Sequence, residues 1–201
     1  MVRRRAAHIF PKEKNGHYVE PQWCSRRLFE EERFGRPGDL ILDPACGWGR
    51  VLHAAQDAGF KVVGCDVVNR KPLLRGPFYL HNFLTWELPP KLKVKSIVCN
   101  PPFDQVEEFC LQALEVARYK VAMLTLLRRL PAAHYLRAMP LETIYFLTPR
   151  PSMPPGHWIA QGNEPGGGTQ DFVWLVFNKN MPAFNAWPTF RWLHRDEGNK
   201  K

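Results

Sequence analysis

The sequence feature that most constrains the fold is a strand, a glycine-containing loop, a helix and a second strand within residues 39–66. Residues 39–43 and 61–65 are short apolar runs typical of buried strands, and a helix is expected at about residues 51–58. Gly47 and Gly49 lack a Cβ, so the loop between strand and helix can turn sharply and let a ligand approach the backbone. This order predicts an α/β fold with a ligand site at the first loop.

The end of the second strand indicates which ligand fits this loop. Asp66 follows the strand directly, about 20 residues after the loop, where a ribose-binding carboxylate belongs. The loop lacks the third glycine of a dinucleotide fingerprint and the Gly-Lys-Ser/Thr of a phosphate loop. A cationic nucleoside without phosphates therefore fits better than NAD or ATP. For Gly-x-Gly taken alone, an ordinary tight turn would be the better interpretation.

A second motif, Asn100-Pro101-Pro102-Phe103, follows an apolar strand expected at residues 96–99. The Asn100 side-chain oxygen and the Pro101 carbonyl could accept hydrogen bonds from an exocyclic adenine amine and draw its nitrogen toward an attacking, tetrahedral geometry. Two successive prolines hold the backbone extended and remove competing amide donors. The Phe103 ring offers a face on which an extruded base can stack. Alone, the tetrapeptide is equally compatible with a strand that ends in a proline turn.

Together these motifs make residues 18–178 resemble a class I S-adenosylmethionine-dependent methyltransferase, of the branch that methylates adenine N6 in DNA. The resemblance implies a Rossmann-like α/β fold: a mostly parallel seven-stranded sheet, helices on both faces and a C-terminal antiparallel hairpin. It also implies S-adenosylmethionine as methyl donor and S-adenosylhomocysteine as product. Residues 43–49 resemble the cofactor loop, Asp66 the acid that binds the cofactor ribose, and residues 100–103 the catalytic tetrapeptide.

The resemblance extends to other cofactor-binding segments. Residues 17–21 resemble the segment that covers the methionine end of the cofactor, although Glu20 stands where a small hydroxyl residue is commoner. Asn82-Phe83 resembles an Asp-Phe pair whose acid binds the adenine amine; the Asn82 amide oxygen can still accept that hydrogen bond, and capping of a turn is the alternative. The cofactor-binding residues implied are Tyr18, Pro21, Asp43, Pro44, Ala45, Gly47, Gly49, Asp66, Val67, Asn82, Phe83 and Asn100.

The net charge of +9 on 201 residues indicates a polyanionic partner. Phosphate neutralisation by Lys and Arg supplies most non-specific affinity for nucleic acid. We expect DNA as the partner, with RNA possible, and contacts from interior arginines such as Arg128 and Arg150. For Lys200 and Lys201 a solvated terminus is the better interpretation.

The chain is expected to form one methyltransferase domain over residues 1–201, with a basic N-terminal arm at 1–16 and a tail at 179–201. Other expected elements are helices at 22–34, 104–118 and 132–138 and strands at 78–81, 121–127, 143–147 and 171–177. The Pro/Gly-rich connection at 148–170 is longer than the about 12 to 15 residues that structureless loops usually reach. We expect it to cover the active site, with Arg150 contacting substrate by charge and Trp158 by stacking. Disorder without function is the alternative.

Other features narrow the function. No apolar run approaches the about 20 residues of a membrane span, so a cytoplasmic protein is expected. The five cysteines are odd in number and lack Cys-x-x-Cys spacing, which favours reduced, buried thiols. The seven histidines lack ligand spacing, so no metal site is expected. Neither the oligomeric state nor a choice between single-stranded and duplex substrate follows from the sequence.

Three functions compete at this point. Adenine-N6 methylation of DNA is the leading one; the same tetrapeptide geometry could serve adenine in RNA, or a protein glutamine amide, where the aromatic is usually tyrosine. The third is a catalytically silent module that binds cofactor or nucleic acid, which would be expected to have lost Asn100 or the glycine loop. Phe103 and the basic charge favour nucleic acid. Residues 168–174 resemble the ending of compact phage and prophage methyltransferases, which implies a solitary modification enzyme.

Overall fold

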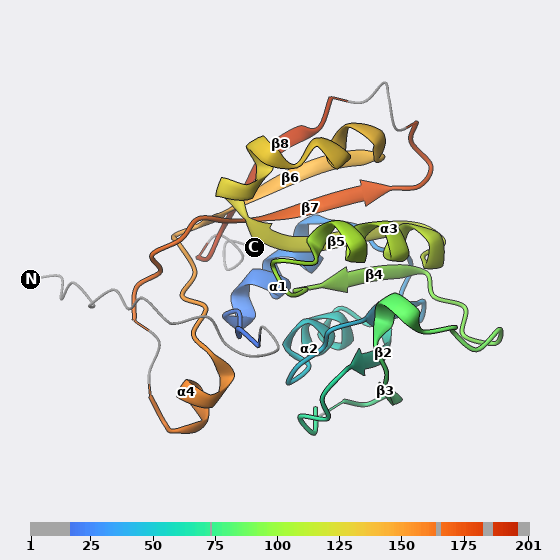
Figure 1. The fold of residues 1–201 in the computed structure, drawn as a ribbon, viewed down its shortest axis with the longest axis horizontal. Coiled ribbons are helices and arrows are strands. Elements are labelled where there is room, and N and C mark those ends of the chain that lie inside the picture. Colours follow the sequence, from blue (N-terminus) through green and yellow to red (C-terminus); the bar gives the residue numbers. More distant parts are fainter. Residues whose placement is uncertain (1–16, 73, 164–165, 183–186, 197–201) are drawn as a thin grey trace, which may run out of the picture.

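The computed structural model describes residues 17–72, 74–163, 166–182 and 187–196, so the basic arm at 1–16 and the chain end at 197–201 lie outside the described residues. One eight-stranded mixed sheet forms the centre, in the order β3-β2-β1-β4-β5-β7-β6-β8 (Figure 1). Its strands are β1 Leu40–Asp43, β2 Lys61–Asp66, β3 Phe78–Leu80, β4 Ser96–Cys99, β5 Lys120–Leu126, β6 Leu141–Thr148, β7 Phe172–Asn178 and β8 Thr189–His194.

Strand direction follows from the pairings. The first five strands pair in parallel, β7 runs antiparallel between β5 and β6, and β8 pairs in parallel with β6. Strands covered on both faces are mostly apolar, and all seven residues of β5 are buried, with Lys120 and Thr125 as its polar members. The Rossmann-like α/β fold predicted from the sequence is therefore confirmed.

Helices cover both faces of the sheet (Figure 1). α1 (Gln22–Glu31) and α2 (Arg50–Asp57) pack on one face through a buried cluster that includes Leu28 and Leu52. α3 (Val106–Val116) packs on the other face through Phe109 and its neighbours. The described residues also form short helices: α4 Gly156–Ala160 and the 3₁₀ helices η2 Phe83–Thr85, η3 Leu127–Ala132 and η4 His134–Ala138.

Two predicted elements differ from the structure. The sheet has eight strands instead of seven, because β8 forms within the segment expected to be a tail. The helix expected at 132–138 is not a regular α-helix: η3 contains Pro131, which has no N–H to donate, and Ala133 (ψ 64°) separates η3 from η4. The 148–170 connection contains α4 and bridges to the N-terminal segment through Tyr18 and Pro155.

Sheet topology determines where a ligand can bind. Strand order reverses between β1 and β4, which are neighbours in the sheet although β2 and β3 lie between them in the chain. In open α/β sheets, ligands bind beyond the carboxyl ends of the strands at such a reversal. Asp43, Asp66 and Asn100 lie at the carboxyl ends of β1, β2 and β4, so the fold brings them to one edge. Within the part of the chain that is described, no helix has the length and apolarity to cross a membrane.

Candidate active site

A pocket lies at the carboxyl edge of the sheet, over the ends of β1, β2 and β4. It unites most of the residues that the sequence implied for cofactor binding, although these come from five separate segments. Its lining includes Tyr18, Asp43, Pro44, Ala45, Gly47, Asp66, Val67, Asn82, Phe83, Asn100 and Pro102.

The floor of the pocket is the loop after β1. Asp43 is 1% exposed and accepts a hydrogen bond from the Ala45 amide at 3.1 Å, and burial raises the pKa of this carboxyl well above its usual value. Gly47 (φ +51°) and Gly49 (φ +83°) adopt the left-handed conformation, which glycine reaches without strain. The loop therefore turns from strand to α2 in the way its two glycines predict.

Asp66 closes the opposite side of the pocket at the end of β2. Its carboxylate accepts hydrogen bonds from the Gly47 amide (2.9 Å), the Val68 amide (2.9 Å) and the Arg70 guanidinium (2.7 Å). The residue is 5% exposed. Asp66 thus links the glycine loop to β2 and presents negative charge to the pocket, while Arg70 balances that charge from the rim.

The pocket is narrow. Its free volume is about 80 Å³, whereas small-molecule sites commonly hold about 300–1,000 Å³. Arg70, His17 and Trp48 line it, and the His17 and Trp48 rings meet edge to face at 5.2 Å. A nucleoside would therefore enter only with movement of side chains at the rim. The groups a nucleoside needs are in place: a carboxylate for ribose, glycine backbone for close approach, and the apolar side chains Val67 and Phe83.

Asn100 has its two amide atoms in different environments. Nδ2 donates to the Tyr18 carbonyl oxygen (3.0 Å) and to Glu20 Oε2 (2.8 Å). Oδ1 is buried and has no hydrogen-bond partner among the described residues. Because about 90% or more of buried polar groups are paired, an unpaired buried acceptor requires an explanation. The two donor contacts fix the amide so that Oδ1 is available to a ligand.

Glu20 is the residue whose role the sequence left open. It is 5% exposed and lies within hydrogen-bond distance of Asn100 Nδ2. Burial raises the pKa of Glu20, and the hydrogen bonds it accepts and the positive charge of Arg50 act in the opposite direction. Arg50 also donates to the Glu20 carbonyl oxygen at 3.3 Å. A buried carboxyl at this position has a defined partner, the amide of Asn100.

Phe103 lies in a second hollow of about 330 Å³, next to the first. The two share Tyr18 in their linings, and the Tyr18 and Phe103 rings stack with centroids 6.0 Å apart. The ring centroid of Phe172 lies 5.6 Å from that of Phe103, and Arg128 lines the same hollow. A planar group held here would lie beside the Asn100 pocket.

The remaining predicted residues lie around these two hollows or away from them. Pro101 is buried between Asn100 and Pro102, Gly49 precedes the first residue of α2, and Pro21 precedes α1 and lines a neighbouring hollow together with Arg150.

Three predicted residues have contacts of a different kind from those expected. Asn82 lines the pocket, but its Oδ1 accepts from the Leu84 amide at 3.1 Å and so caps η2. Arg150 pairs with Asp171 through two hydrogen bonds of 2.6 and 3.1 Å. Trp158 lies in α4 and is not part of the lining of either hollow.

Sequence reasoning missed Glu20 as a partner of Asn100, and Arg70 as a partner of Asp66. The first pair is separated by 80 positions, and no local pattern signals it. The second pair joins the last residue of β2 to a residue in the loop that follows, and a spacing of four residues has no fixed meaning outside a helix. The described residues contain no group of three or more His, Cys, Asp or Glu side chains able to hold a metal ion.

No family model and no curated protein matches this sequence. Solved structures do share the fold, at low identity. The methyltransferase subunit of a type I restriction-modification system from Streptococcus thermophilus superposes with a TM-score of 0.58 at 13% identity, over 84% of this chain and 46% of that one. The 23S rRNA methyltransferase ErmE superposes with a TM-score of 0.54 at 14% identity, over 85% of this chain and 73% of that one. A TehB-like SAM-dependent methyltransferase from Corynebacterium glutamicum superposes with a TM-score of 0.50 at 16% identity, over 76% of this chain and 85% of that one.

These three proteins define the class of fold: that of the Rossmann-like methyltransferases. Only one of the three names, that of the 23S rRNA methyltransferase, states a substrate, and a fold alone does not select one.

Proposed function

We propose that this protein transfers a methyl group from S-adenosylmethionine to the N6 amine of adenine in DNA. The observation that carries the proposal is the buried Oδ1 of Asn100, which no described residue pairs with, next to a pocket with the groups that a nucleoside needs. The methyltransferase fold supports the coarser part of the proposal, methyl transfer from S-adenosylmethionine. The compact chain would act as a solitary modification enzyme of the phage type, in the cytoplasm.

The residues present fit the cofactor. Asp66 would accept hydrogen bonds from the ribose hydroxyls, Gly47 and Gly49 would lie under the methionine part, and Phe83 would pack against the adenine. When bound, S-adenosylmethionine supplies a methyl group on a sulfonium cation, so no strong base is required to activate the acceptor.

The chain's own contribution is to orient and polarise the acceptor amine. Asn100 Oδ1 and the Pro101 carbonyl would accept its two hydrogens, which directs the nitrogen lone pair toward the methyl group. As the N–C bond formed and the methyl group's C–S bond broke, the positive charge would pass from sulfur, left as a neutral thioether, to nitrogen. Both oxygens would stabilise that charge before the nitrogen released a proton to water. Phe103 would stack on the base outside the duplex.

Glu20 has a positioning role in this proposal, because it holds Asn100 Nδ2 and thereby keeps Oδ1 directed at the substrate. Glu20→Leu should lower kcat by about 10- to 100-fold, the cost of a misplaced catalytic group. Glu20→Gln can present an amide oxygen to the same N–H and should stay within about fivefold of wild type. Steady-state kinetics measure the kcat of each variant, and its cofactor affinity and melting temperature are recorded alongside.

The comparison of the two variants separates positioning from folding. A loss of kcat in Glu20→Leu with cofactor affinity and melting temperature retained, and recovery in Glu20→Gln, supports positioning. Equal kcat in all three proteins would remove Glu20 from the mechanism.

Adenine in RNA is the second candidate, since the same site geometry serves both and one fold neighbour is an rRNA methyltransferase. Methylation of a protein glutamine amide would use Asn100 similarly, but the exposed arginines Arg128 and Arg129 favour a polyanion.

Incubation of the purified protein with tritiated S-adenosylmethionine and separate DNA, RNA and protein acceptors tests the proposal. We expect label in DNA, and none with Asn100→Ala as the matched control. Label in RNA or protein alone would reject the DNA assignment, and no label in any acceptor would reject the enzyme.

A further inference from the structure

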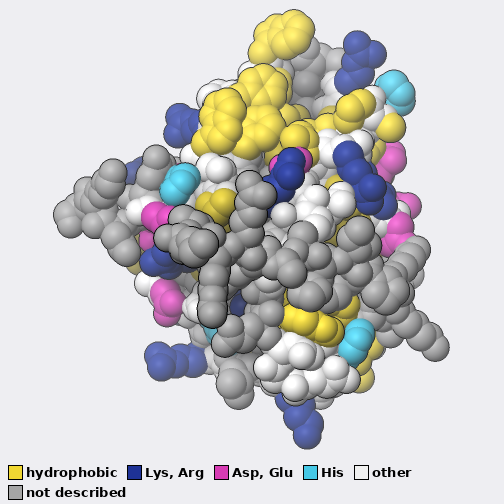
Figure 2. Space-filling view, turned by 90° about the vertical axis from the view of Figure 1, so that its left-hand side faces the viewer, with side chains coloured by type: hydrophobic (Ala, Val, Ile, Leu, Met, Phe, Trp, Pro, Cys, Tyr) yellow, Lys and Arg dark blue, Asp and Glu magenta, His cyan; other side chains and the backbone are white. Residues whose placement is uncertain are grey.

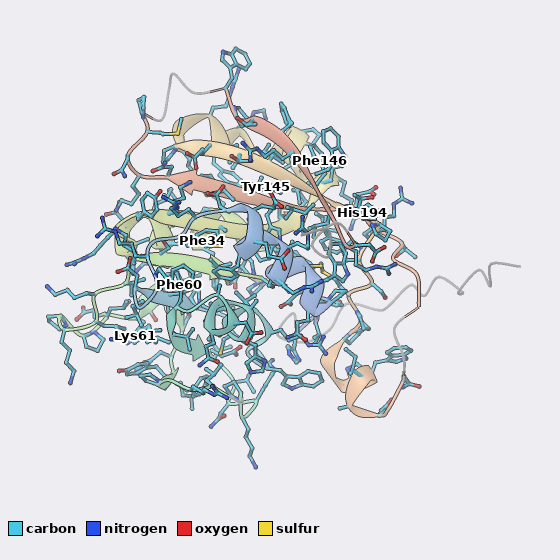
Figure 3. All side chains as sticks on the ribbon, turned by 180° about the vertical axis from the view of Figure 1, so that it is seen from behind. Phe34, Phe60, Lys61, Tyr145, Phe146 and His194 are labelled. Carbon is cyan, nitrogen blue, oxygen red and sulfur yellow. The ribbon has the colours of Figure 1, made fainter. Side chains whose placement is uncertain are left out.

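An exposed row of aromatic rings lies on the edge of the sheet that β6 and β8 form. Phe190 is 58% exposed and Trp192 is 64% exposed, and both belong to β8. Their rings flank Phe146 of β6, at centroid distances of 6.1 and 5.1 Å. Tyr145, the preceding residue, is buried on the opposite face (Figure 3). Clustered exposed rings of this kind mark interaction sites on soluble proteins.

The row is continuous with the candidate active site. The Phe103 hollow includes Phe172 in its lining, and Phe172 also lines a further hollow of about 300 Å³ together with Phe146, Arg150 and Trp192. Adjacent hollows thus share a wall residue all the way from Asn100 to β8: Tyr18 first, then Phe172. A flexible chain that leaves Phe103 toward β8 would pass Phe172, the residue that the two hollows share.

Charge distinguishes the two directions in which such a chain could leave Phe103. Toward α3 the next hollow is lined by three acidic residues, Asp104, Glu107 and Glu108, along with Arg128 and Arg129. Toward β8 the hollows contain Arg128 and Arg150 and one acid, Asp171, which is paired with Arg150. In the view onto the carboxyl edge, hydrophobic side chains gather in the upper part, where β6 and β8 lie, with Lys and Arg beside them (Figure 2). A polyanion is therefore better accommodated on the β8 side.

We propose that Trp192, Phe146 and Phe190 extend the Phe103 platform as a stacking track for unpaired nucleotides that flank the target adenine in a single strand. This inference rests on the proposed function and adds that the nucleic-acid substrate is single-stranded. Aromatic rings interleaved with arginines hold single strands because every base has a face to stack, whereas bases inside a duplex already stack on each other. The protein should therefore prefer single-stranded or locally opened nucleic acid.

Fluorescence anisotropy tests the track without methyl transfer. The probes are a labelled single-stranded DNA of about 12 nucleotides, within the site sizes of such proteins, the RNA of the same sequence, and the blunt DNA duplex. We expect Trp192→Ala to weaken single-strand binding by about 5- to 50-fold, as for loss of one stacked base, and to change duplex binding little. Leu111→Ala, at a 53% exposed position on α3, is the matched control and should change neither.

The outcomes separate the possible occupants of this surface. Equal loss of affinity for single strand and duplex, or no loss, would overturn the track. The track would also be overturned if the wild type sedimented as a dimer and Trp192→Ala as a monomer while single-strand affinity stayed unchanged. The rings would then form an interface between two copies of this chain. The DNA and RNA probes show which single strand is preferred. If no acceptor is methylated but Trp192→Ala still weakens single-strand binding selectively, the proposed function fails and the binding track remains.

Discussion

Replacing Asn100 by alanine should abolish methyl transfer while cofactor affinity stays within a few-fold of wild type. The substitution removes the buried Oδ1 acceptor, which has no partner in the described part of the chain, and with it the polarisation of the attacking amine that we propose. Loss of one preorganised hydrogen-bonding group at a reacting centre costs about 10² to 10³ in rate. Single-turnover kinetics with the labelled cofactor measure the rate, and titration calorimetry with S-adenosylhomocysteine measures the binding.

Asn82→Ala is the matched control for Asn100→Ala. Both asparagines line the same pocket, but Asn82 Oδ1 already accepts from the Leu84 amide. Its loss should change turnover little and cofactor affinity moderately. Wild-type turnover in Asn100→Ala, or equal loss of turnover in both variants, would contradict the role given to Asn100.

Asp66→Ala should weaken cofactor binding by about 1.5 to 3 kcal/mol, the value of a charge-assisted hydrogen bond. The carboxylate lies at the end of β2, 5% exposed, where it would accept the ribose hydroxyls. Calorimetry with S-adenosylhomocysteine measures the effect. Because the change also removes acceptors from the Gly47 and Val68 amides, the melting temperature of the variant has to be recorded with it.

Arg70→Ala separates loss of the ion pair from loss of the ribose acceptor. Both variants lack the Arg70–Asp66 contact of 2.7 Å, but only Asp66→Ala lacks the carboxylate. Arg70→Ala should therefore retain cofactor binding. If Asp66→Ala bound cofactor as tightly as wild type, or if both variants lost binding equally, Asp66 would not be the ribose ligand.

The parts of the fold that could be predicted depend on local patterns. β1 and β2 are apolar runs with a glycine loop between them, and an acid at a strand end reaches the carboxyl edge in any parallel sheet. For the same reason, the position of Asn100 after β4 is enough to predict that it lies at this edge.

The parts that could not be predicted depend on contacts between distant segments. β8 is a strand because it pairs with β6. Its exposed Phe190 and Trp192 and its buried Leu193 lie in a segment that the sequence indicated only as a C-terminal tail. The Glu20–Asn100 hydrogen bond joins residues 80 positions apart. Trp158 was expected at the substrate site because it lies in the long 148–170 connection. The structure places it in α4, outside the linings of the two hollows, and the length of a connection does not determine where its side chains lie.

The most direct test of the central claim is mass spectrometry of nucleosides released from DNA after incubation with the protein and S-adenosylmethionine. Single-stranded and duplex DNA are both supplied, and Asn100→Ala serves as background. The account predicts N6-methyladenine with the wild-type protein and none with the variant. A methyl group on cytosine, or adenine methylation that persists in Asn100→Ala, would contradict it.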